Sequence, residues 1–411
     1  MEQVLSNSDF MPASELWLLA GRIPRFALPS AECVLPTTPP TTTHHLPTTN
    51  HHPRPPTHAR RPTTHHPPPT PQGSSMNEQH EPLKRRAFLV GTGAVVAGAL
   101  GARIVVDRDE ASLRAEVFVA KVASYSDDLV GVVRQGLAEL GLGGAWVGGK
   151  RVLLKPNLVE PSSDVPHINT HPAVVRAVAE ALLGLGAREV FVAEGQGHTR
   201  DSELVLEQSG LGPVLAQAGI AYVDLNHDDV FTVSNRLGFT RLSQFHLPRT
   251  LKRADLIVSL PKLKTHHWAG VTLAMKNLFG VLPGVCYGWP KNVLHREGIN
   301  ESILDLNAAV RPHLAIVDGI VGMEGDGPIM GTPRHSGVLV MGANLPAVDA
   351  TSARLMGIDP FQIAYLAAAS GRLGPIAERH IHQRGEAIAR LVRQYTVLKH
   401  VSRTGRKSKS R

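Results

Sequence analysis

The residues best equipped for chemistry gather in one stretch of the chain. Lys262, Lys264 and His266 stand at alternate positions, and Lys276 and Asn277 follow shortly after. Lysine ammonium groups neutralise phosphates and carboxylates, and histidine transfers protons near neutral pH. This stretch therefore predicts a binding site for a small anionic ligand, with His266 moving a proton if the protein is an enzyme.

Two earlier segments carry similar groups. Lys155 and Asn157 directly follow an apolar run, and Glu194 follows a second apolar run together with Gly195 and Gly197. Glycines next to a charged residue permit a backbone nest for an anion, although a lone Gly-x-Gly is a weak signal. We expect Lys155, Asn157 and Glu194 to contribute to ligand binding.

Carboxylates gather between residues 318 and 328, among several glycines. Glu324 is a second candidate for proton transfer, and Asp318 together with His266 is a candidate ligand pair for a divalent metal. The spacing matches neither an EF-hand nor an HExxH pair. Asp318 would equally serve to cap a turn, which is the commoner role of Asp before Gly.

Each candidate also has a structural interpretation. Single lysines usually lie solvated on the surface, although Lys262 and Lys264 would point the same way from extended backbone. His266 could be a hydrogen-bonded structural histidine. Asp349, shortly after Asn344, is expected to cap the helix that starts there.

A helix expected over residues 271–278 would position Lys276. Thr272 and Lys276 are four residues apart, which places both on one face of a helix. The amino end of that helix, near Gly270, would add its own attraction for an anion.

Apolar runs and helical patterns alternate between residues 107 and 398. Strands are predicted at residues 116–122, 151–154, 189–193, 221–225, 255–260, 314–318 and 337–341. Helices are predicted at residues 128–140, 172–185, 202–208, 271–278, 301–310 and 345–356, with a last helical stretch at 376–398. This alternation favours an α/β fold, a layered and mostly parallel sheet with flanking helices. In such sheets ligands bind beyond the carboxyl ends of the strands, where the four candidate segments would meet.

The ordered set of motifs resembles the DUF362 family, a group of unknown function. The matching segments are residues 155–157, 170–172, 261–266, 276–280, 318–328 and 344–349, and the likeness extends over residues 115–360. The resemblance implies a fold and a site location but no reaction. Some family members carry a ferredoxin-like iron–sulfur segment. This chain has only Cys33 and Cys286, so no Cys-ligated cluster is expected.

The first 106 residues differ in character from the rest. Between residues 36 and 72, 30 of 37 residues are Pro, Thr or His, a composition typical of disorder. Residues 76–106 hold Arg85-Arg86-Ala87-Phe88-Leu89, a soft apolar run and a small-residue end. This pattern resembles a twin-arginine (Tat) export signal, and the alternative is a buried Gly/Ala-rich helix. Because such signals act at the amino terminus, we expect translation to start at Met76 and residues 1–75 to be a start-site artefact.

Charge and hydropathy exclude two classes of protein. The net charge of +8 arises in the flanks, since residues 107–398 hold 28 Lys and Arg against 29 Asp and Glu. A near-neutral body with a basic, solvated tail at 399–411 argues against a nucleic-acid groove. The longest apolar run, residues 87–102, is too short for a stable membrane span.

The sequence therefore predicts a bacterial protein exported by the Tat machinery to the periplasm or beyond, which binds a small phosphate or carboxylate ligand and, if it is an enzyme, transforms it. A divalent metal is an open cofactor candidate. The alternative is a non-catalytic extracytoplasmic binding protein for an anionic metabolite, which would bind without turnover.

Overall fold

The computed structural model describes residues 114–197 and 201–398. The expectations for the Pro/Thr/His-rich region, the Tat-type signal and the basic tail lie outside these residues. No helix in the described ranges is both long enough and apolar enough to cross a bilayer.

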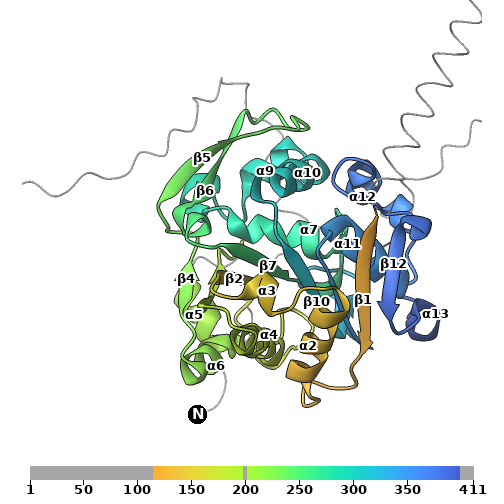
Figure 1. Ribbon diagram of the computed structural model, residues 1–411. Coiled ribbons are helices and arrows are strands. Elements are labelled where there is room, and N and C mark those ends of the chain that lie inside the picture. The colour runs from red at the N-terminus through yellow and green to blue at the C-terminus, as the bar shows by residue number, and fades with distance from the viewer. Residues whose placement is uncertain (1–113, 198–200, 399–411) are drawn as a thin grey trace, which may run out of the picture. The chain divides into compact units, whose positions relative to one another are not determined.

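The described residues form a mixed, mostly parallel sheet that lies between helices (Figure 1). Its strands follow in the order β12 (Ile381–Gly385), β1 (Ala115–Lys121), β11 (Thr332–Gly342), β10 (Leu314–Glu324), β7 (Leu256–Leu260), β2 (Arg151–Pro156), β3 (Glu189–Glu194) and β4 (Tyr222–Asp224). All neighbours in this row pair in parallel except β11, which runs antiparallel to both β1 and β10. The predicted α/β fold class is confirmed.

Two apolar cores cover the two faces of the sheet. Successive residues of a strand point to opposite faces, so Leu153 joins one core while Val152 and Leu154 join the other. The helices that contribute to the Val152 core include α2 (Leu129–Glu139), α4 (Pro172–Gly184), α5 (Ser202–Gln208) and α6 (Leu211–Ala218). Those that contribute to the Leu153 core include α7 (Ala274–Asn277), α10 (Ile299–Val310), α11 (Leu345–Leu355), α12 (Ala364–Ala369) and α13 (Ile388–Leu391).

Short elements complete the described chain. They are α3 (Gly144–Val147), the 3-10 turn η3 (Leu278–Val281), α8 (Gly284–Tyr287) and α9 (Asn292–Glu297). The strands β5 (Val230–Ser234) and β6 (Gln244–Pro248) form a separate antiparallel pair, which the sequence did not predict. Both strands pack against the Leu153 core. Strand formation depends on such packing as well as on the residues of the strand itself, so local sequence is a weak guide here.

Two predicted helices are wrong in part. Residues 270–272 form the strand β9 (Gly270–Thr272), so the helix begins only at Ala274 and Thr272 does not share its face with Lys276. The stretch 376–398 contains the strand β12 and only the short helix α13. In both places pairing with a neighbouring strand overrides the local helical pattern, since β9 pairs with β8 (Lys262–His266) and β12 with β1.

The segment after β7 is a further strand that the sequence pattern did not predict. After Pro261 the chain continues as β8, which pairs in parallel with the second half of β10 and places Lys262 opposite Asp318. β7 and β8 therefore lie one after the other along the same neighbour, so the lysines of β8 enter the interior of the fold.

Candidate functional site

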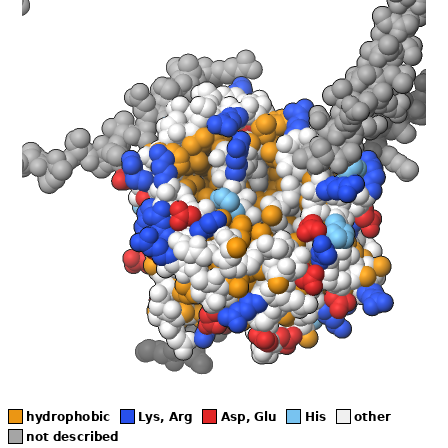
Figure 2. Space-filling view, in the orientation of Figure 1, with side chains coloured by type: hydrophobic (Ala, Val, Ile, Leu, Met, Phe, Trp, Pro, Cys, Tyr) orange, Lys and Arg blue, Asp and Glu red, His pale blue; other side chains and the backbone are white. Residues whose placement is uncertain are grey.

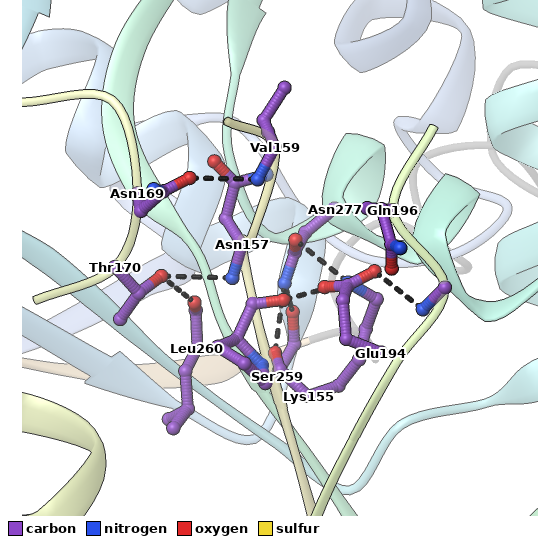
Figure 3. A network of polar contacts seen from close by, with 12 residues as sticks. Lys155, Asn157, Val159, Asn169, Thr170, Glu194, Gln196, Ser259, Leu260 and Asn277 are labelled. Carbon is purple, nitrogen blue, oxygen red and sulfur yellow. Dashed lines mark hydrogen bonds and ion pairs between the residues drawn. The ribbon is translucent and has the colours of Figure 1, made fainter. Parts of the chain in front are cut away.

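A buried ion pair joins the ends of β2 and β3 (Figure 3). The Lys155 ammonium lies 2.5 Å from Glu194 Oε2 and also donates to the Asn277 side-chain oxygen at 3.1 Å. Asn277 in turn donates to the Lys155 carbonyl and to Ser259 Oγ. Burial lowers the pKa of Lys155, and the Glu194 carboxylate opposes that shift. The structure thus brings together three of the residues predicted to bind a ligand.

Gly280 lies directly against this ion pair, and its lack of a side chain makes the close approach possible. A Cβ at this position would overlap Glu194 Oε1 and lie 2.7 Å from the Lys155 ammonium. Its carbonyl accepts a hydrogen bond from Gly195 N at 2.8 Å, which fastens η3 to the end of β3. Only a residue without a side chain fits between the backbone and the ion pair.

Asp349 fixes the helix that carries Lys276 and Asn277. Its carboxylate accepts the backbone N–H groups of Ala274 at 2.7 Å and Met275 at 3.0 Å. The expected capping role is therefore real, but the capped helix is α7, not α11, in which Asp349 itself lies and which Asn344 caps. A capping carboxylate satisfies amide groups that a short helix leaves unpaired.

A second buried ion pair links β8 to β10. The Lys262 ammonium lies 2.6 Å from Asp318 Oδ2, and both side chains are wholly buried. The same carboxylate accepts Tyr125 Oη–H at 3.1 Å and His171 N–H at 2.9 Å. The Tyr125 ring stacks on His171 with 3.7 Å between centroids. Lys262 and Asp318 therefore form an ion pair with each other, whereas the sequence predicted an anion ligand for Lys262 and a metal for Asp318.

Lys264 is a buried amine without a carboxylate partner. Its ammonium donates to the carbonyls of Ile168 at 2.9 Å and Pro328 at 3.1 Å. Burial, together with the charges of Lys262 and Lys276, lowers the pKa of Lys264 well below its usual value. A nearby anion would stabilise the charged form of Lys264.

His266 has a defined tautomer. Its Nδ1 accepts the backbone N–H groups of Trp268 at 3.0 Å and Ala269 at 3.2 Å, so the neutral ring carries its proton on Nε2. Burial and the charge of Lys276 lower its pKa well below the ordinary value. His266 therefore offers a hydrogen-bond donor at neutral pH.

Two residues that the sequence did not single out belong to this region. The Lys291 ammonium donates to Asn226 Oδ1 at 2.5 Å and to the Leu282 carbonyl. His295 Nδ1 faces the Lys291 carbonyl at 3.2 Å, so the neutral ring has a bare Nε2, and burial lowers its pKa to about 4. Both lie outside any recognisable spacing, and only the tertiary fold brings them to the site.

Two predicted residues make no hydrogen bond with the amines in the described part of the chain. Glu324 Oε2 accepts the backbone N–H of Thr396 at 2.8 Å, which ties it to the carboxyl-terminal segment. Asn157 contributes its backbone N–H to Thr170 Oγ1 at 2.9 Å, and its own Oδ1 is buried without a partner in the described residues. Within residues 114–197 and 201–398, no group of three or more His, Cys, Asp or Glu side chains is arranged to hold a metal.

Comparison with known proteins agrees with the motifs. The chain matches the domain of unknown function DUF362 over residues 152–354. It is 33% identical over 238 residues to the thylakoid-associated protein sll1697 of Synechocystis sp., a match that covers 57% of this chain and 71% of that protein. The chain belongs to the DUF362 family.

Solved structures give a weaker likeness. A crystal structure of a Thermotoga maritima protein has a TM-score of 0.36 at 14% identity, over 58% of this chain and 61% of that one. The lactate racemase apoprotein of Thermoanaerobacterium thermosaccharolyticum has a TM-score of 0.32 at 15% identity, over 59% of this chain and 58% of that one. This chain therefore covers less than two thirds of either solved chain.

Proposed function

We propose that this protein binds a small organic anion, with a phosphate or carboxylate group, at the lysine cluster formed by Lys155, Lys262, Lys264, Lys276 and Lys291. The single observation that supports it is a mismatch of charge. Lys155 and Lys262 each have a carboxylate within ion-pair distance, whereas the other three amines have none in the described residues. Buried cations are normally paired, so an anionic ligand would complete the cluster.

Lys276 is the lysine of the cluster that a ligand can reach most easily, because it is the least buried. Its side chain is half-buried and lies over the Phe279 ring, with the ammonium 3.7 Å from the ring centroid. His267 and His295 beside it are also only half-buried, whereas Lys155, Lys262 and Lys264 are fully enclosed. We infer that the anion contacts Lys276 directly and that the enclosed lysines add long-range attraction.

The surface charge supports a small ligand over a large polyanion. On the face shown in Figure 2, Lys and Arg side chains alternate with Asp and Glu rather than forming one basic field. Nucleic acids are recognised through extended basic surfaces. A charge concentrated in the interior suits a compact anion instead.

Direct binding measurements test the proposal. Oxalate and inorganic phosphate are titrated into the full-length protein by calorimetry, with uncharged oxamide as the comparison ligand. We expect saturable binding of the anions and none of oxamide. Lys276→Met should raise the Kd for oxalate by about 10- to 100-fold, the effect of losing one charge-assisted hydrogen bond.

The matched control is Lys121→Met, because Lys121 is exposed on β1 and takes no part in the cluster. Equal affinity for oxalate in the wild type and in Lys276→Met, with both proteins folded, would contradict the proposal.

Catalysis and simple binding remain distinct proposals for the same site. In an enzyme, His266 would donate a proton from Nε2, and His266→Gln would abolish turnover of a bound anion while leaving its Kd within a few fold. A binding protein would show no turnover of any bound anion in the wild type.

A further inference from the structure

The five lysines of the cluster differ in what holds their nitrogen atoms. Lys155 and Lys262 are in ion pairs, and Lys264 and Lys291 donate to carbonyl or amide oxygens. The Lys276 nitrogen makes no hydrogen bond or ion pair with any described residue. It lies over the face of the Phe279 ring. The form of an amine that attacks electrophiles is unprotonated, with a lone pair not engaged in a hydrogen bond. Among the five lysines, Lys276 is the one whose nitrogen is not held by a hydrogen bond or an ion pair in the described residues.

The surroundings of Lys276 keep that amine available. The helix α7 that carries it is capped from α11 by Asp349, and the adjacent Asn277 is fixed by Lys155 and Ser259. Burial and the charge of Lys155 lower the pKa of Lys276 to about 7. A buried amine close to another cation loses its proton more readily than a solvated lysine.

We propose that Lys276 forms a reversible imine with the carbonyl carbon of an anionic aldehyde or ketone, such as a 2-oxo acid or a phosphorylated aldehyde. This inference rests on the proposed function, because the anionic group of the substrate is the part that the lysine cluster attracts.

The step balances without an oxidant or reductant. The Lys276 lone pair forms a C–N bond while the carbonyl π pair moves to oxygen, and a proton passes from nitrogen to that oxygen. Loss of water then breaks the C–O bond as the C=N bond forms. His295 has a bare Nε2 and His266 an Nε2–H, and the charge of Lys276 lowers the pKa of both rings, which places an acceptor and a donor nearby.

Chemical trapping tests the proposal on the full-length wild-type protein. Glyoxylate and pyridoxal 5′-phosphate are added separately at pH 7.5, each imine is reduced with cyanoborohydride, and the modified lysines are located by peptide mass spectrometry. We expect occupancy at Lys276 at least about tenfold above that at exposed Lys121, because far more of an amine with a lowered pKa is unprotonated. Lys276→Arg, which keeps the charge, should lose the adduct, and Lys121→Arg should keep it.

The outcomes separate this inference from the proposed function. Saturable oxalate binding with adducts spread evenly over exposed lysines would overturn the imine and leave anion binding intact. Preferential labelling of Lys276 by neutral propanal as well as by glyoxylate, with no oxalate binding, would support the reactive amine and overturn the anion site. Because the adduct is mapped in the wild type, a poorly folded variant does not decide the result.

Discussion

The Asp349 carboxylate lies 2.7 Å from the backbone nitrogen of Ala274, a residue 75 positions earlier in the chain. This contact joins α11 to the first turn of α7, and α7 carries both Lys276 and Asn277. The position of the candidate site therefore depends on a residue outside the lysine cluster. The capped helix has only four residues, too few to be stable without such support.

Asp349 should make the folded protein sensitive to pH. Burial raises the pKa of Asp349 to about 7, against an unfolded value of about 3.9. Between these values the folded state holds a proton that the unfolded state has released, so the free energy of unfolding should fall as pH rises from about 4 to about 7, by at most about 1.4 kcal/mol per pH unit. Urea unfolding at pH 5 and pH 7 measures the slope. Asp349→Asn should flatten it, and an equal slope in both proteins would contradict the assignment.

Gly280→Ala should destabilise the protein because its methyl group would overlap the Glu194 carboxylate. We expect a loss of about 1–3 kcal/mol in the free energy of unfolding, as is usual for overpacking. Gly143→Ala is the control, since a Cβ at that position meets nothing within 4 Å. If both substitutions have the same effect in urea unfolding, the close approach of Gly280 to the ion pair is not what constrains this position.

The Lys262–Asp318 pair should behave as a coupled unit. Lys262→Met leaves a carboxylate buried without its cation, which typically costs about 3–5 kcal/mol. The double variant Lys262→Met with Asp318→Asn should be more stable than the sum of the two single losses predicts, by about 1–3 kcal/mol. Urea unfolding of all four proteins gives the coupling. The exposed pair Arg176–Glu180 is the control, with a coupling below about 1 kcal/mol. Additive losses at Lys262 and Asp318 would refute the coupling.

Anion binding should weaken as pH rises. The pKa of Lys276 is lowered to about 7 by burial and by Lys155, so its positive charge is present below that pH and lost above it. Oxalate stays a dianion throughout, and its Kd should rise by up to about tenfold per pH unit above pH 7. Calorimetric titrations from pH 6 to pH 8.5 measure the trend, which Lys276→Arg should remove because arginine stays charged. A flat Kd in the wild type would argue against Lys276 as the contact.

The twin-arginine pattern predicts export, and its test is a change that preserves charge. Replacing Arg85 and Arg86 with lysines should leave a precursor inside the cell, because the pathway reads the arginine pair itself. Cell fractionation followed by immunoblotting measures the distribution. Lys84→Arg, which leaves the pair intact, is the control. Unimpaired export of the double-lysine variant would remove the basis for an extracytoplasmic location.

Local sequence pattern was sufficient for most of the sheet. Buried strands such as β2 and β3 appear in the sequence as apolar runs, and their carboxyl ends carry Lys155 and Glu194, which were therefore expected at one edge. The strand β8 is absent from the predicted strands, because its lysines give it no apolar pattern of its own. Pairing with β10 makes it a strand, and that partner is more than fifty residues away along the chain.

The composition of the site was harder to predict. Sequence spacing cannot show that Asp318 forms an ion pair with Lys262, or that Glu324 accepts a hydrogen bond from Thr396. Lys291 enters the cluster from a left-handed backbone position at φ 67°, which is unusual for a lysine. Such placements follow from tertiary packing, which a single sequence does not reveal.

The strand β1, the first described strand, lies between β11 and β12. A nascent chain therefore holds β1 without either neighbour until residues 332–342 leave the ribosome, and without the second until residues 381–385 follow. This edge of the sheet forms only once residues 381–385 are present, so truncation before residue 381 would expose the backbone of β1 as an unpaired edge open to aggregation. Completion of this edge of the sheet thus depends on a strand that lies more than 250 residues after β1 along the chain.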